Sequence, residues 1–144
     1  MFKKLLLPIS SEHLSKKAID KTRDLTKEFN CDIKVLYIIE KKMINKINRA
    51  CEYIRTEKQI EELEYEIEDA LKEEFDTFFD KWKEELNNSK NINTKVVTGE
   101  YSEEVKKEIN NFKPDLIIIE IKRKTMVKYH IIYERTDIPI LIVR

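Results

Sequence analysis

The sequence predicts an α/β fold in which a parallel β-sheet lies between layers of helices. Short apolar runs alternate along the chain with longer stretches of helical periodicity, which is the pattern of βαβ units. Several of these runs are continuous in apolar residues, as in strands that are covered on both faces. With 144 residues the chain has the length of one ordinary domain. We therefore expect residues 1–144 to form a single domain.

The first predicted elements are a strand, a helix and a second strand. Phe2–Pro8 is an apolar run that ends at a proline, which favours a buried strand. Ser10 or Ser11 is a suitable N-cap for the helix that follows. The β-branched run Ile33–Ile39 then predicts the second strand. The apolar residues of the helix share one face at a spacing of 3.6 residues: Leu14, Ala18, Leu25 and Phe29.

A long helical segment is predicted at about 41–90, because Lys41–Asn88 contains neither glycine nor proline. As one helix it would extend about 70 Å at about 1.5 Å per residue, so we expect a break. Thr56 and Gln59 have the spacing of a capping box and place that break. The stripe that follows suits either a partner-binding or coiled-coil face, or an ordinary helix that packs on its own sheet, and one end of so long a helix is free to protrude. Its residues are Ile60, Leu63, Ile67, Leu71, Phe75, Phe78, Trp82 and Leu86.

The second half of the chain predicts three more strands and two helices. Ser102 is a suitable cap for the first helix, which would turn Val105, Ile109 and Phe112 inward. A short helix is expected around Met126–Arg135. The strands are Asn93–Thr98, Asp115–Ile121 and Pro139–Arg144, and the second of them is the most apolar.

Composition argues against several functional classes. The chain has 28 basic and 28 acidic residues, so no net charge attracts it to nucleic acid or to an anionic membrane. No apolar run approaches the ~18 residues of a membrane span, and we expect a cytoplasmic protein. Cys31 and Cys51 are therefore expected to be reduced thiols. The histidines, His13 and His130, and the two cysteines lack the spacing of a zinc site.

A single glycine, Gly99, restricts the chemistry further. Phosphate loops and dinucleotide fingerprints need several glycines, because the backbone must turn tightly and approach the phosphates. Ser10 and Ser11 lie near His13, but they are not part of the Gly-x-Ser-x-Gly turn that exposes a nucleophile. The sequence therefore predicts a protein that is not an enzyme, with no catalytic residues and no metal site.

Several segments together resemble the universal stress protein family: Phe2–Ala18, Val35–Glu40, Val97–Glu100, Asp115–Ile119 and Pro139–Arg144. The resemblance covers nearly the whole chain. It implies a doubly wound, five-stranded parallel sheet of order 3-2-1-4-5 with helices on both faces.

Many members of that family bind ATP through an acidic residue after the first strand and a glycine-rich stretch after the fourth. Here Ser10 occupies the acidic position, and Glu120–Tyr129 (EIKRKTMVKY) contains no glycine. The chain therefore resembles the branch that lacks the ATP motif, and we expect no cofactor.

A candidate crevice lies at the carboxyl ends of the first and fourth strands, if these strands are neighbours. Two hydroxyls, a helix N-terminus and three cations are groups that hold a nucleotide or another small anion. A solvated basic loop beside an ordinary helix cap explains the same residues, and both interpretations remain open. The residues are Ser10, Ser11 and His13 on one side, and Lys122, Arg123 and Lys124 on the other.

The final strand predicts a homodimer. The resemblance places Pro139–Val143 at a sheet edge, where a proline is allowed. Ile140, Leu141, Ile142 and Val143 would leave an apolar, unpaired edge in a monomer. Two-fold pairing with a second copy closes such an edge. We expect a non-enzymatic module that acts through dimerisation and contacts with a protein partner, with anion binding as the alternative.

Overall fold

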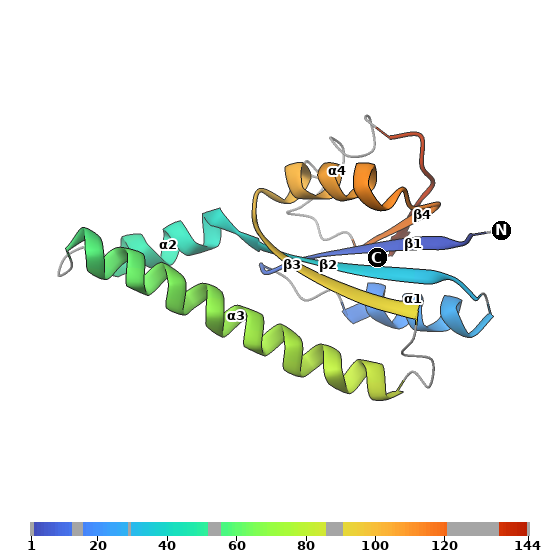
Figure 1. Ribbon diagram of the computed structural model, residues 1–144, viewed down its shortest axis with the longest axis horizontal. Helices are drawn as coiled ribbons and strands as arrows, with labels where there is room; N and C mark the ends of the chain where they lie inside the picture. The colour runs from blue at the N-terminus through green and yellow to red at the C-terminus, as the bar shows by residue number, and fades with distance from the viewer. Residues whose placement is uncertain are drawn as a thin grey trace.

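The structure, a computed structural model, describes residues 2–12, 16–28, 30–51, 56–85, 91–120 and 136–143. Its centre is a five-stranded, all-parallel sheet (Figure 1). The strand order is β3-β2-β1-β4-β5, which confirms the predicted fold class and topology. The strands are β1 (Lys4–Ser10), β2 (Asp32–Glu40), β3 (Ile92–Gly99), β4 (Leu116–Glu120) and β5 (Ile140–Val143).

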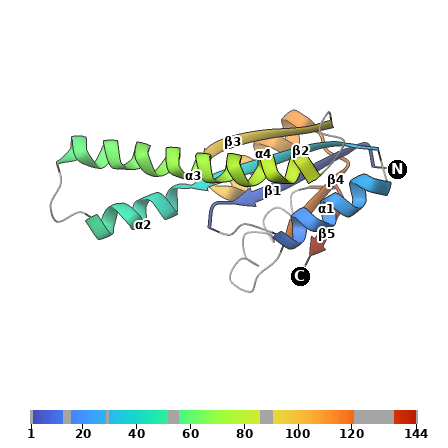
Figure 2. The same ribbon diagram turned by 90° about the horizontal axis from the view of Figure 1, so that it is seen from below.

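Helices cover both faces of this sheet (Figures 1 and 2). The described helices are α1 (Lys16–Glu28), α2 (Lys41–Cys51), α3 (Glu57–Glu85) and α4 (Tyr101–Phe112). Helices α1 and α3 lie on one face, and α4 lies on the other. The expected helix around Met126–Arg135 lies outside the described residues.

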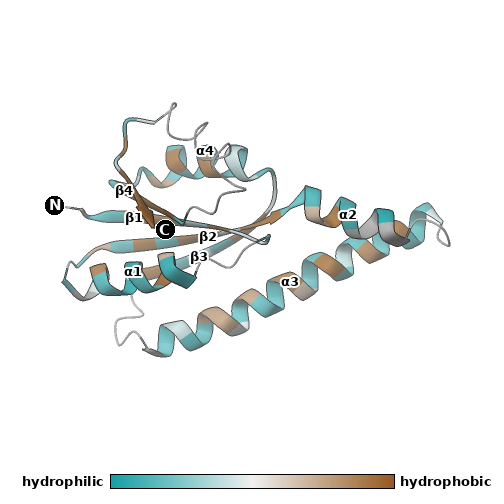
Figure 3. Cartoon of the chain, turned by 180° about the vertical axis from the view of Figure 1, so that it is seen from behind, coloured by the Kyte–Doolittle hydropathy of each residue, from teal (hydrophilic) through white to brown (hydrophobic). Residues whose placement is uncertain are grey.

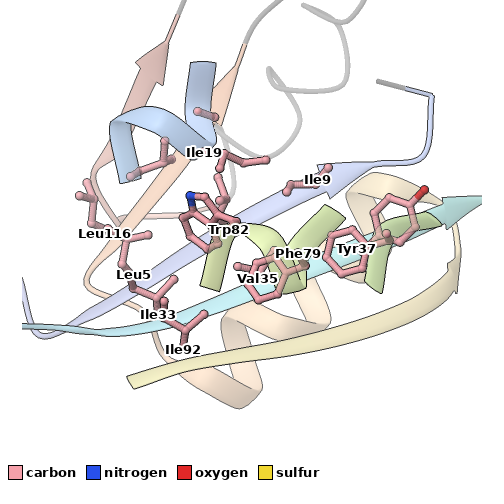
Figure 4. Packing of buried hydrophobic residues seen from close by; sticks show 14 of the residues in the cluster. Leu5, Ile9, Ile19, Ile33, Val35, Tyr37, Phe79, Trp82, Ile92 and Leu116 are labelled. Atoms are coloured by element: carbon pink, nitrogen blue, oxygen red, sulfur yellow. The ribbon is translucent and has the colours of Figure 1, made fainter. Parts of the chain in front are cut away.

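Two apolar cores result, because successive residues of a strand point to opposite faces. On one face, Phe79 and Trp82 of α3 pack over β1 and β2 (Figure 4), and Phe75 belongs to the same cluster. On the other face, Tyr101 and Val105 of α4 pack over alternate residues of the same strands. The central strands are buried on both sides, which explains why their sequences are continuous in apolar residues.

The first strand ends two residues later than the sequence predicts. Pro8 lies inside β1, and the strand continues to Ser10. Ser11 donates its N–H to the Ile38 carbonyl of β2. Because the backbone nitrogens of successive strand residues point to opposite sides, the nitrogen of Pro8, three residues earlier, faces β4. The register of β1 with β4 covers only Leu5 and Leu6, and a proline is tolerated there because no ladder hydrogen bond is lost. Ser10 is therefore a strand residue, and α1 begins at Lys16.

The capping box at Thr56 is confirmed and starts α3. The Thr56 N–H donates to Oε1 of Gln59 at 3.0 Å, and the Gln59 N–H donates to Oγ1 of Thr56 at 3.4 Å. The N-cap of α4 differs from the prediction, since Glu100 occupies that position and Ser102 lies within the helix. Cys31 is a buried free thiol, as expected, while the side chain of Cys51 lies outside the described residues.

The two edge strands of the sheet differ in character. In β3, residues Asn93, Thr94 and Lys95 are exposed and polar. In β5, the residues are all apolar, and Ile142 is 43% exposed.

Candidate functional site

The carboxyl ends of β1, β2 and β4 meet at one edge of the sheet, where doubly wound folds bind their ligands. These strands end at Ser10, Glu40 and Glu120, respectively. Both glutamates are buried, at 3% and 6% exposure. Neither glutamate was predicted to bind a ligand, although a charged residue at the end of an apolar strand is a signal that the sequence contains.

Two serine hydroxyls join the ends of β1 and β2. The Ser10 hydroxyl donates to Oε2 of Glu40 at 2.5 Å and accepts the Glu12 N–H at 3.1 Å. The Ser11 hydroxyl accepts the Glu40 N–H at 3.0 Å. Both predicted serines are thus brought together, but each is engaged with Glu40 of the neighbouring strand.

A cavity of about 510 Å³ lies beside these serines. It is an open pocket lined by residues of β1, β2, α2 and α3 and by Ser11, so it lies on the β2 side of the first strand. Its walls are mostly apolar, and Glu74 and Lys81 are its charged lining residues. The lining residues are Ser10, Ser11, Tyr37, Met43, Leu71, Glu74, Phe75, Thr77, Phe78 and Lys81.

Tyr37 supplies a neutral phenol to this cavity. Its ring stacks on Phe75, with 4.3 Å between ring centroids and 4° between the planes. Its hydroxyl oxygen points away from the ring cluster in Figure 4. Burial, together with the negative charge of Glu74, raises the pKa of Tyr37 to about 12. The hydroxyl therefore keeps its proton at neutral pH and is a hydrogen-bond donor.

The other predicted crevice residues, His13, Lys122, Arg123 and Lys124, lie outside the described residues. Within the described ranges, no cluster of three or more His, Cys, Asp or Glu side chains could hold a metal ion. Nor does any helix in those ranges have the length and apolar character needed to cross a membrane.

The chain belongs to the universal stress protein family, whose model matches residues 1–144. Among curated proteins, no sequence matches this chain. Its fold is similar to solved structures that share little sequence with it. Hypothetical protein MJ0577 has a TM-score of 0.74 at 21% identity, and the match covers 99% of this chain and 96% of that one.

Two further similar structures carry family names. The universal stress protein UspA from Lactobacillus plantarum has a TM-score of 0.74 at 10% identity, covering 99% of this chain and 97% of that chain. A universal stress protein family protein from Arabidopsis thaliana with AMP bound has a TM-score of 0.61 at 12% identity, covering 98% and 90%. At these identities the likeness shows the fold alone.

Proposed function

We propose that this chain is a universal stress protein module that acts by dimerisation and by contacts with a protein partner. In this proposal it catalyses no reaction and does not bind ATP in the manner of the ATP-binding members. The observation that carries the proposal is the pair of buried carboxyl groups, Glu40 and Glu120, on the two strands that flank β1. These buried side chains, with Glu40 held by the Ser10 hydroxyl, occupy the edge where doubly wound folds bind their ligands, which argues against phosphate binding there.

The only glycine of the chain lies away from the β1–β4 switch point. Gly99 ends β3, an edge strand separated from β1 by β2. A Cβ atom at this position would lie 2.6 Å from Oε1 of Glu104, so the glycine leaves room for the Glu104 side chain at the start of α4. This role in packing explains Gly99 without a nucleotide and supports the proposal.

The edge strand β5 supports dimerisation. In the part of the chain that the structure describes, β5 pairs with β4 alone. Ile142 is among the exposed large apolar residues. Pairing of two β5 strands about a two-fold axis would satisfy the free backbone groups and cover this side chain.

A second candidate function is small-molecule binding, and the cavity beside Ser10 and Ser11 favours it. Its volume of about 510 Å³ falls within the roughly 300–1,000 Å³ of ordinary ligand sites. Tyr37, Phe75 and Phe78 give it aromatic walls that suit a planar ring. The AMP-bound relative from Arabidopsis thaliana adds support for a nucleotide in this candidate role.

The change in Tm caused by millimolar ATP or AMP with magnesium distinguishes the two proposed functions. A ligand at ~100 times its Kd stabilises a protein by about 2.7 kcal/mol, which corresponds to a rise of several degrees in Tm at this chain length. We expect no rise with either nucleotide, and no nucleotide in denaturing mass spectrometry of the purified protein. A rise of several degrees, or a co-purified nucleotide, would favour the second candidate.

A further inference from the structure

Helix α2 and the first half of α3 form an antiparallel helical hairpin that projects beyond the sheet (Figures 2 and 3). We call residues 41–51 and 56–70 the hairpin. The second half of α3 is anchored, since Phe75, Phe79 and Trp82 are buried against the sheet. The structure therefore resolves the alternative left open by the sequence, because one half of the helix packs on the sheet and the other half protrudes.

The apolar stripe of the hairpin is only partly covered. Ile60, Leu63 and Ile67 are half-buried, although they continue the stripe that is fully buried at Phe75. Helix α3 contacts α2, where Ile44 is buried and Met43 is half-buried. Two helices alone do not enclose an apolar seam, whereas four helices do. The apolar stripe of the hairpin therefore resembles one half of a four-helix bundle, in which two further helices would bury it.

The two helices of the hairpin carry opposite charge. Helix α2 has four exposed cations and no acidic residue: Lys41, Lys42, Lys46 and Arg49. Residues 57–69 of α3 contain one lysine and seven acidic residues: Glu57, Glu61, Glu62, Glu64, Glu66, Glu68 and Asp69. Each copy of the chain thus brings both a basic and an acidic helix, and two copies complement each other when unlike helices are neighbours.

We propose that the hairpin is a self-association surface for a second copy of this chain. Two hairpins pack stripe against stripe about a two-fold axis, with each α2 beside the α3 of the partner, and complete a four-helix bundle. This contact deepens the proposed role in protein contacts and rests on it, but it uses a surface different from β5. Together, the two contacts join four chains when their two-fold axes meet at right angles, which closes the assembly.

The size of the hairpin sets the strength expected of the contact. The 11 residues of α2 extend about 16 Å, and two helices side by side span about 20 Å. Such a face is smaller than a standard specific interface, so the contact is expected to be weak. We therefore expect association at tens of micromolar protein, and we expect it to weaken in high salt because its charges are exposed.

Two charge-reversed variants test the contact in a background carrying Ile142→Lys, which removes the β5 pairing. One variant carries Lys42→Glu, Lys46→Glu and Arg49→Glu, and makes α2 acidic. The other carries Glu57→Lys, Glu61→Lys and Glu66→Lys, and leaves residues 57–69 of α3 with four basic and four acidic residues, so their net negative charge is removed. By light scattering, we expect the background protein to be a dimer and each variant to be a monomer. An equimolar mixture of the two variants should be a dimer again.

A matched control reverses the same number of charges on α1, with Lys16→Glu, Lys17→Glu and Lys21→Glu, and should stay dimeric. The proposal fails if the hairpin variants keep the mass of the background protein, or if the mixture stays monomeric. If Ile142→Lys makes the protein insoluble, the α2 variant is measured with β5 unaltered, where the mass should fall from four chains to two. An unchanged mass there also overturns the proposal. A failed β5 contact is seen separately, because Ile142→Lys would then leave the mass of the parent protein unaltered.

Discussion

Glu108 is the most buried charged side chain in the described part of the structure, at 1% exposure. It lies on α4 and pairs with Lys34 of β2 and with Lys95 of β3, the latter at 3.0 Å. Burial raises the pKa of the Glu108 carboxyl, but the hydrogen bonds and positive charges of the two lysines outweigh it, so the pKa is lowered from 4.5. One carboxylate thereby ties a helix to two strands.

We predict that Glu108→Gln lowers the free energy of unfolding by about 1–3 kcal/mol at pH 7. A buried hydrogen-bonded charge is lost, although both lysines keep access to water, at 23% and 43% exposure. Urea unfolding of the variant and its parent measures this difference. The matched control is Glu103→Gln, because Glu103 is 57% exposed in its ion pair with Lys106. A control as destabilised as Glu108→Gln would contradict the prediction.

The pH dependence follows from the direction of the shift. Because the folded pKa of Glu108 is lowered, its contribution is fully present above the unfolded value of 4.5. It is lost as the pH falls through the folded pKa. The difference in free energy of unfolding between the parent and Glu108→Gln should therefore be constant near neutral pH and should disappear in acid, below pH 4.5.

At the scale of elements, α3 combines two environments in one continuous helix. Phe79 is 3% exposed and contacts Phe75 and Trp82, with ring centroids 5.5 Å and 5.0 Å away. Leu63 lies four turns earlier on the hairpin and is only half-buried. Local stability should therefore fall from the anchored half of the helix to the protruding half.

We predict that Phe79→Ala costs about 3–5 kcal/mol of unfolding free energy, as for other buried aromatic residues. Leu63→Ala in a monomeric background should cost less than half as much, since it leaves little cavity. Denaturant unfolding gives both values. In hydrogen exchange, the backbone amides of residues 57–70 should exchange faster than those of residues 71–85. Equal losses from the two substitutions would mean that the hairpin is as tightly packed as the sheet-bound half.

The elements that the sequence alone predicted best are those with a clear local signal, such as a run of apolar residues or a capping pair. The apolar strands and the capping box at Thr56 were predicted because their signals are local. The end of β1 was missed because Pro8 normally stops a strand, and only its neighbour in the sheet explains why it does not. Strand order came from the family resemblance, since strand periodicity does not specify neighbours.

The candidate site was less predictable than the fold. Ser10 and Ser11 were predicted near the strand ends, but their hydrogen bonds to Glu40 depend on a register between residues about thirty positions apart. The cavity depends on how α3 crosses the end of β2, which no local pattern encodes. The apolar stripe of α3 could not reveal its protruding half, because its spacing is the same where the helix leaves the sheet.

At the scale of the whole molecule, the β5 edge predicts a dimer. We expect the parent protein to exceed one chain mass in light scattering at tens of micromolar. Ile142→Lys should halve that mass, because the lysine places charge on an edge that must be apolar to pair. The matched control is Thr94→Lys on the opposite edge strand β3, where Thr94 is already exposed. The prediction would be contradicted if the control lowered the mass, or if Ile142→Lys left the mass unchanged.

The unlike edges of the sheet have a consequence for solubility. A sheet in which both edge strands can pair with another copy grows without limit, as in fibrils. Here the β3 edge exposes Asn93, Thr94 and Lys95, and a lysine on an edge strand discourages further pairing. After two β5 strands have met, both free edges of the joined sheet are β3 edges. Edge-to-edge pairing of sheets should therefore stop at two chains, even when the protein is concentrated.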